Sequence, residues 1–92
     1  MQVNVFKPES LGTIEIFGTS LSTQTQALLI ALQECNVKYI HHPSMPNSPE
    51  IANFSPFGTI PVLVHRPNGI YSTRDAVVLF EMTAICQYLT EL

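Results

Sequence analysis

Residues 55–63, SPFGTIPVL, restrict the fold more than any other stretch of this chain. Pro61 has no N–H to donate to a sheet, so it belongs at the first residue of a strand or in a tight turn. Gly58 allows a backbone conformation that other residues resist. Because a residue before proline is driven into an extended conformation, the N–H and C=O of Ile60 point sideways. The stretch predicts a loop that leads into a strand, and its backbone could also pair with an extended peptide ligand.

The composition indicates one small domain with unusually few charges. Charged residues make up 12% of the 92 residues and hydrophobic residues 46%, whereas typical domains have about 25% charged residues. We therefore expect another domain or a second subunit to cover part of the surface. The net charge is −3 with only four basic residues, which argues against nucleic-acid binding.

Several common kinds of segment and site are not indicated by the sequence. Residues 1–11 lack the basic start and apolar core of a signal peptide, and no apolar run approaches the ~18 residues of a transmembrane helix. Cys35 and Cys86 form no C-x-x-C motif, which argues against a disulfide scaffold, a zinc site and a dithiol redox centre. His41 and His42 are neighbours on a predicted strand and so point to opposite faces. We expect a cytoplasmic protein without a metal site or membrane association.

Hydrophobic patterning predicts strands and helices after a loose extension at residues 1–13. Strands are expected at residues 14–17, 37–42, 61–65 and 76–80. The first helix has an apolar face at the 3.6-residue period, made of Thr25, Leu28, Leu29, Leu32 and Cys35. Asn36 is expected to end it, because Asn tolerates the left-handed cap conformation. A short helix is expected at residues 49–54, with Ser48 as N-cap and Pro49 at its first position.

The last helix is expected to bury Met82, Ile85, Cys86 and Leu89. The resulting order is β-α-β-α-β-β-α. The short strand–helix–strand unit favours a right-handed crossover and a parallel pair, and the last two strands form an antiparallel hairpin. Their connection at residues 66–75 includes the turn signal Asn68-Gly69 and is either an extended hairpin or a surface insertion. The fold class is therefore α/β and thioredoxin-like, with a four-stranded mixed sheet.

Two motifs resemble the N-terminal domain of the cytosolic glutathione transferases. Pro56-Phe57-Gly58 followed by residues 60–63 is similar to the family pattern Asn-Pro-Phe-Gly-Gln-Val-Pro, and residues 79–89 are similar to its Phe-Glu-Ser-x-Ala-Ile pattern. The loop at residues 17–23 is similar to that of the serine-type, phi-like members common in plants and fungi. The resemblance covers about residues 14–92 and implies a cis peptide bond before Pro61. It also implies glutathione as co-substrate.

The resemblance assigns roles to six residues. It implies that Ser22 stabilises the thiolate of glutathione, and that the peptide is bound by Thr59, Ile60, Pro61, Glu81 and Met82. A hydroxyl donor and the positive end of a helix both favour a thiolate over a thiol. Simpler roles stay open. Ser22 can be a helix N-cap, as can Thr23 in a capping box with Gln26. Thr59 and Ile60 can merely begin a strand, and Glu81 can merely precede a helix.

The chain departs from the family pattern at three positions near this site. Met82 stands where the family has a serine that holds the γ-glutamyl carboxylate. A lost hydrogen bond to a charged group is worth about 1.5–3 kcal/mol. Thr83 could supply a hydroxyl if the helix began one residue later. Gln26 and Ala27 stand where serine-type relatives often carry Arg, so the site has less positive charge.

The resemblance implies a transferase of detoxification chemistry, in which glutathione thiolate attacks a small electrophile, and it implies a possible homodimer. The helical C-terminal domain that builds most of the acceptor pocket in the family is expected to be absent from this chain, which ends at Leu92. The alternative is a catalytically inactive, thioredoxin-like protein-interaction domain or a truncated fragment. A glutaredoxin-like oxidoreductase is disfavoured, because no cysteine lies near Ser22. The sequence does not identify the electrophile.

Overall fold

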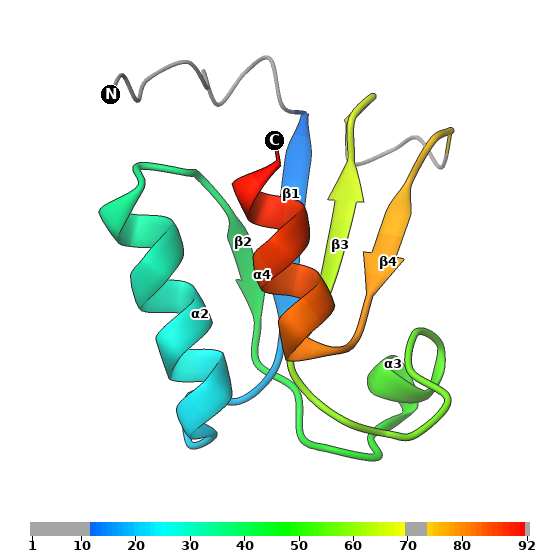
Figure 1. Cartoon of the computed structure of the whole chain (residues 1–92). Helices are drawn as coiled ribbons and strands as arrows, with labels where there is room; N and C mark the ends of the chain where they lie inside the picture. Colours follow the sequence, from blue (N-terminus) through cyan, green and yellow to red (C-terminus); the bar gives the residue numbers. More distant parts are fainter. Residues whose placement is uncertain (1–11, 70–73, 92) are drawn as a thin grey trace.

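Four strands form one mixed sheet in the order β2-β1-β3-β4 (Figure 1). The computed structural model describes residues 12–69 and 74–91. Along the chain the elements are β1 (Thr13–Phe17), α2 (Thr23–Glu34), β2 (Ile40–His42), α3 (Pro49–Ala52), β3 (Val62–Arg66), β4 (Val77–Leu79) and α4 (Met82–Thr90). The predicted order β-α-β-α-β-β-α is confirmed.

The strand pairing also agrees with the prediction. β1 pairs with β2 in parallel through the α2 crossover, and β3 pairs with β4 in an antiparallel arrangement. β1 lies antiparallel to β3, with Ile16 opposite Leu63. Both α2 and α4 begin at the lower end of the sheet in Figure 1, which is also the end where the chain enters β3. Residues from three separate parts of the sequence therefore meet at this end.

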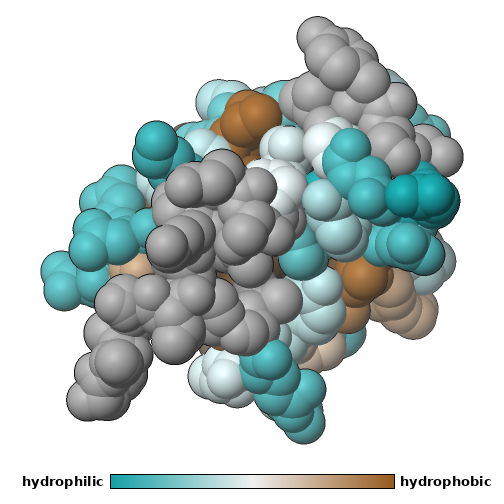
Figure 2. All heavy atoms as spheres, turned by 90° about the horizontal axis from the view of Figure 1, so that it is seen from above, coloured by the Kyte–Doolittle hydropathy of each residue, from teal (hydrophilic) through white to brown (hydrophobic). Residues whose placement is uncertain are grey.

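The sheet has a hydrophobic cluster on each face, because strand side chains alternate. The larger cluster packs under α2 and α4 and consists of Ile14, Ile16, Leu28, Leu32, Leu63 and Ile85. The second lies on the α3 side and consists of Phe17, Ile51, Val62 and Val64. At ~25 cal/mol per Å² of apolar area removed from water, these clusters supply the main driving force for folding. Seen from above, the exposed hydrophobic side chains form separate small areas among hydrophilic ones (Figure 2).

Helix starts and stops follow the local sequence signals. Ser48 caps α3 by accepting a hydrogen bond from the Ile51 backbone N–H, with Pro49 at the first helical position. Asn36 takes a left-handed conformation, φ 59°, just after α2. Both of these predictions are confirmed. Gly69 has φ 98° and its N–H bonds to the Arg66 carbonyl, so the predicted turn at residues 68–69 is present.

The predicted bounds of four elements were wrong by one to three residues. β2 covers only Ile40–His42, β4 only Val77–Leu79, and α3 ends at Ala52. β3 begins at Val62, one residue after Pro61, and runs on to Arg66. Apolar patterning marks where a strand is possible, whereas the observed bounds depend on which backbone groups find a partner in a neighbouring strand.

The buried faces of the two long helices also differ from the prediction. Cys35 is the exposed C-cap residue of α2, and Cys86 is exposed on α4. Ile85 is fully buried, and Tyr88 packs against the larger cluster together with Met82 and Leu89. The helix is rotated so that Tyr88 instead of Cys86 faces the sheet, where its hydroxyl bonds to a histidine of β3. This rotation is a long-range effect that a helical period alone does not specify.

Some predictions concern residues that the structure does not describe. The extension at residues 1–13 lies almost wholly outside the described residues, although β1 begins one residue early, at Thr13. Residues 70–73 of the connection between β3 and β4 also lie outside them. In the described part of the chain, no helix is long and apolar enough to cross a membrane.

Candidate functional site

Ser22 is the N-cap of α2. Its backbone is extended, with φ −83° and ψ 129°, and its Oγ accepts a hydrogen bond from the Thr25 backbone N–H at 3.3 Å. The alternative capping box is wrong, because Thr23 is already the first helical residue. Gln26 instead donates from Nε2 to the Ser20 carbonyl at 2.5 Å. A hydroxyl has one donor and two acceptor lone pairs, so the Ser22 O–H can still donate to a ligand while its oxygen caps the helix.

The peptide bond between Ile60 and Pro61 is cis, as the resemblance implied. The loop before it is held by its own side chains. Ser55 Oγ accepts from the Thr59 N–H at 3.3 Å and lies 3.2 Å from Thr59 Oγ1. Pro61 is buried directly before β3, and Ile60 is half-buried beside it.

α4 starts without a side-chain cap. Glu81 is the N-cap residue, with φ −112°, but its carboxylate accepts no hydrogen bond from the first turn. Its backbone carbonyl accepts from the Ile85 N–H at 2.9 Å, which closes the first helical turn. The first N–H groups of a helix have no partner within the helix, and together with the macrodipole they favour a bound anion. Met82 is the first helical residue and packs partly against the core.

A pocket of about 290 Å³ lies where these parts of the chain meet. It is lined by Gln24, Thr59, Ile60, Phe80, Glu81, Met82 and Thr83. Four of the residues singled out from the sequence, Thr59, Ile60, Glu81 and Met82, therefore share one cavity. Pro61 is the next residue after Ile60. Ser22 does not line the pocket; it lies two residues before Gln24, at the start of the same helix.

The sequence interpretation missed two of the lining residues. Gln24 is in the first turn of α2, and only the tertiary fold brings it to the pocket beside Thr59 and Ile60 of the loop before β3. Phe80 directly precedes Glu81, and its ring lies 6.1 Å from that of Phe57, centroid to centroid. The sequence signal that could have identified Phe80 is an aromatic residue directly before the acidic N-cap of a helix. Thr83 was considered as a substitute hydroxyl; α4 begins at Met82, yet Thr83 still lines the pocket.

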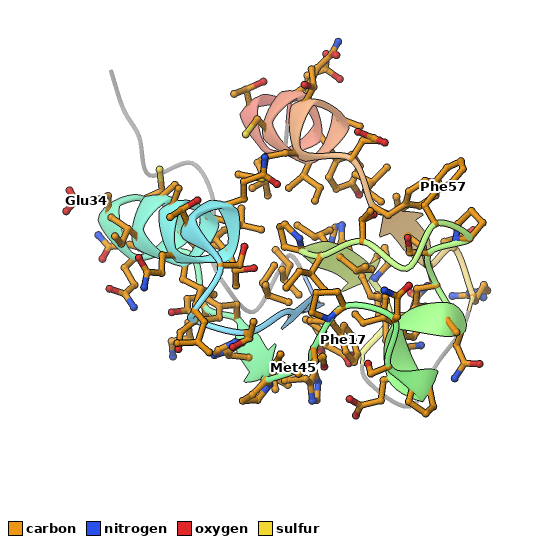
Figure 3. The ribbon with its side chains drawn as sticks, turned by 90° about the horizontal axis from the view of Figure 1, so that it is seen from below. Phe17, Glu34, Met45 and Phe57 are labelled. Atoms are coloured by element: carbon orange, nitrogen blue, oxygen red, sulfur yellow. The ribbon has the colours of Figure 1, made fainter. Side chains whose placement is uncertain are left out.

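The polarity of the pocket comes from backbone and amide groups more than from charges. Glu81 is the one charged residue among those that line it. Positive potential is supplied by the N-terminal end of α4 and by that of α2, whose first turn reaches the pocket at Gln24. Figure 3 views the molecule from below, the end at which both helices begin, and Phe57 lies at its margin, on the far side from α2.

The two neighbouring histidines have separate partners. His41 Nε2 lies 2.7 Å from the Gly18 carbonyl oxygen, whereas His42 Nε2 lies 3.0 Å from Glu15 Oε1 and its ring stacks on Phe17. Glu15 is 4% exposed and also accepts from Arg66 Nε at 2.7 Å. Within residues 12–69 and 74–91, no group of three or more His, Cys, Asp or Glu is placed to hold a metal ion.

Comparison with known proteins identifies the class of this domain. Residues 21–92 match the family model described as "Glutathione S-transferase, N-terminal domain", so the chain belongs to this family. A search of the curated proteins found no match.

Among solved structures the chain is similar to glutathione transferase F7 from Populus trichocarpa, with 28% identity and a TM-score of 0.66 over 86% of this chain and 35% of that one. It is similar to glutathione transferase F2 from the same organism, with 25% identity and a TM-score of 0.61 over 85% of this chain and 34% of that one. Glutathione transferase Omega 2S from Trametes versicolor shares the fold, with 18% identity and a TM-score of 0.67 over 86% of this chain and 36% of that one. The predicted thioredoxin-like fold and the family resemblance are thus confirmed. The chain spans about a third of the length of these relatives.

Proposed function

We propose that the pocket at the start of α4 binds glutathione and that Ser22 stabilises its thiolate. The observation that carries this proposal is the shared cavity of Thr59, Ile60, Glu81 and Met82. The pair Thr59-Ile60 is distant in the sequence from the pair Glu81-Met82, and the family resemblance had singled out all four residues for glutathione. Membership of the glutathione S-transferase N-terminal domain family supports the same ligand.

Each part of the tripeptide has a chemically suitable partner. The cysteinyl backbone pairs with the N–H and C=O of Ile60, which precede the cis bond to Pro61. The γ-glutamyl end lies at the start of α4, where the first-turn N–H groups receive its carboxylate and Glu81 receives its ammonium group. The thiol points to the start of α2, where the Ser22 O–H donates to the thiolate and the helix end adds positive potential.

The reaction that we propose is nucleophilic attack by this thiolate on a small electrophile. The sulfur forms a new bond to the electrophilic carbon, and the displaced bond pair leaves with a leaving group or moves into an adjacent polarised bond. The solved relatives are named glutathione transferases, but the chain spans about a third of their length. The acceptor pocket, the role in detoxification and the cytoplasmic location therefore all remain part of the proposal.

Titration calorimetry of the 92-residue chain with reduced glutathione tests the binding step. Met82→Ser should tighten binding about tenfold or more, because a hydrogen bond to a charged group is worth about 1.5–3 kcal/mol. Cys86→Ser is the matched control: it makes a serine on the exposed side of the same helix and should leave the affinity unchanged. A folded chain that gives no binding heat would refute the proposal, and an unchanged affinity in Met82→Ser would refute the placement of the carboxylate.

Ser22→Ala separates thiolate stabilisation from binding. The variant should bind glutathione almost as well, but the thiol of the bound ligand should lose its acidity, which ultraviolet absorbance of the thiolate reports. The alanine also removes the cap that Ser22 gives to Thr25, at a cost of about 1 kcal/mol in folding stability. Ser48→Ala, which removes the equivalent cap of α3, controls for that loss.

A second function, as a non-catalytic interaction domain, is favoured by one surface feature. Phe57 is 70% exposed and contacts Phe80 at the rim of the pocket. A second copy of the chain that covered Phe57 would form a homodimer next to the site. Light scattering of the wild type and Phe57→Ala tests this: a dimer that the variant converts to a monomer supports it, and a wild-type monomer at all concentrations refutes it.

A further inference from the structure

The loop that carries Ser22 is held by hydrogen bonds at nearly every residue. Thr19 accepts from the Ser22 N–H through its carbonyl, at 3.0 Å, and from the Leu21 N–H through its hydroxyl, at 3.2 Å. The Ser20 carbonyl accepts from the Gln26 side chain. The Ser22 carbonyl then accepts from the Gln26 N–H, at 3.0 Å, as α2 begins. The position of the Ser22 hydroxyl is therefore set by the backbone of residues 18–22, which we call the serine loop.

The first residue of the serine loop is fixed from β2. The Gly18 N–H donates to the His42 carbonyl at 3.1 Å, and the Gly18 carbonyl lies 2.7 Å from His41 Nε2. Since a carbonyl oxygen can only accept, His41 Nε2 carries the proton and donates it. Both backbone groups of Gly18 are thus satisfied by neighbouring residues of one strand, and within the described part of the chain the His41 ring is the side chain that takes part.

Gly18 in turn lies directly against Thr25, the residue whose backbone N–H the N-cap Ser22 holds. A methyl group added at Gly18 would lie 2.6 Å from Thr25 Oγ1 and 3.1 Å from Thr25 Cγ2. Thr25 is fully buried, and its own N–H is the donor that holds Ser22 Oγ. A movement of Gly18 would therefore displace Thr25 or open a gap beside it. A continuous series of contacts leads from the His41 ring through Gly18 and Thr25 to the Ser22 hydroxyl.

We propose that His41 is a positioning residue for Ser22: by holding the Gly18 carbonyl it fixes the serine loop in the orientation that lets the Ser22 hydroxyl donate to a bound thiolate. This inference rests on the proposed function. It assigns to His41 no contact with the ligand, because the His41 ring nitrogen is engaged by the Gly18 carbonyl. The binding of the tripeptide backbone at Ile60 and at the start of α4 does not depend on it.

The test compares His41→Ala and His41→Gln with the control His42→Ala. The glutamine retains a side-chain N–H donor that can reach the Gly18 carbonyl. The control removes the neighbouring ring, which contacts Glu15 and Phe17 on the other face of the sheet. The first readout is the pKa of the thiol of bound glutathione, from thiolate absorbance against pH. The second is the affinity for S-methylglutathione, which has no thiol. The third is the hydrogen-exchange rate of the Thr25 amide.

The expected result is selective. His41→Ala should reduce the bound thiolate fraction at neutral pH about three- to tenfold, which is about 0.5–1 pKa unit, and it should speed exchange of the Thr25 amide. Its affinity for S-methylglutathione should stay within about twofold of the wild type. His41→Gln should recover most of the thiolate, and His42→Ala should match the wild type in thiol pKa. If His41→Ala does not fold, His41→Asn takes its place and is compared with His41→Gln, because the asparagine amide is too short to reach the Gly18 carbonyl.

Two results would overturn the inference and leave the proposed function intact. One is a His41→Ala chain that binds glutathione with the thiol pKa and Thr25 exchange of the wild type. The other is an equal loss of thiolate and of S-methylglutathione affinity in both His41→Ala and His42→Ala, which would mean general destabilisation. A folded wild-type chain that binds neither ligand would overturn the proposed function, and the inference with it.

Discussion

Gly58, in the loop before β3, has a backbone conformation that disfavours a side chain, and it lies too close to Asn47 for a side chain to fit. Its φ is 69°, in the left-handed region. A methyl group built there would overlap Asn47 Oδ1 and lie 2.8 Å from Asn47 Cγ. The backbone term costs an alanine about 1–2 kcal/mol. Moving Asn47 Cγ aside turns its χ1 angle away from the rotamer minimum, which costs about 0.5–1.5 kcal/mol. Gly58→Ala should therefore reduce the free energy of unfolding by about 1.5–3.5 kcal/mol.

Gly69→Ala is the matched control for the backbone term. Gly69 has φ 98°, but a methyl group there would meet no atom within 4 Å. Its loss should be about 1–2 kcal/mol, without the steric part. Alanine also makes the unfolded chain less flexible, but this contribution is the same for both substitutions and cancels in their difference. The steric cost alone should then appear as a lower Tm of Gly58→Ala than of Gly69→Ala, by about 4–8 °C per kcal/mol in a domain of this size.

A double-mutant cycle isolates the contact itself. Asn47 also has a positive φ, 63°, so Asn47→Gly removes the side chain without straining the backbone. In that background, Gly58→Ala should lose only the backbone term, which gives a coupling of about 0.5–1.5 kcal/mol between the two positions. Urea unfolding followed by circular dichroism measures all four chains. A coupling of zero, or equal losses at Gly58 and Gly69, would show that the Asn47 contact has no energetic weight.

Two further substitutions test buried interactions. Arg66→Gln removes the charged donor from the Glu15 carboxylate, which is 4% exposed, and should cost up to about 3–5 kcal/mol in urea unfolding because loss of one partner of a buried ion pair is strongly destabilising. Lys38→Gln, at an exposed position, should stay within about 0.5 kcal/mol, and equal losses would contradict this. Burial raises the pKa of Tyr88 above its usual value of 10.0, so the folded chain holds the hydroxyl proton more tightly than the unfolded chain does. The stability that the neutral hydroxyl contributes is complete below about pH 10 and is lost as the pH rises through the pKa of the folded state. Tyr88→Phe should flatten this alkaline loss in unfolding curves against pH, at a cost of about 1 kcal/mol at neutral pH for the lost bond to His65 Nδ1; an unchanged alkaline slope would refute the assignment.

The candidate site was predictable from the sequence to the extent that its motifs are local. The cis bond, the acidic residue before α4 and the serine before α2 each lie within a short motif, so their positions could be carried over from the family pattern. Gln24 could not be found in this way. It lines the pocket only because α2 packs beside the loop that precedes β3, and no short motif records the approach of two elements distant along the chain.

The same division applies to the fold as a whole. The sequence by itself determined the order of strands and helices, the cap at Ser48, and the turn at residues 68–69, because each depends on backbone preferences and hydrogen bonds between residues a few positions apart. Only the tertiary structure decided which residues of α4 are buried, since the rotation of a helix is set by the surface against which it packs. It also decided the contact between His41 and Gly18, because 23 residues separate these positions and the parallel pairing of β1 with β2 joins them.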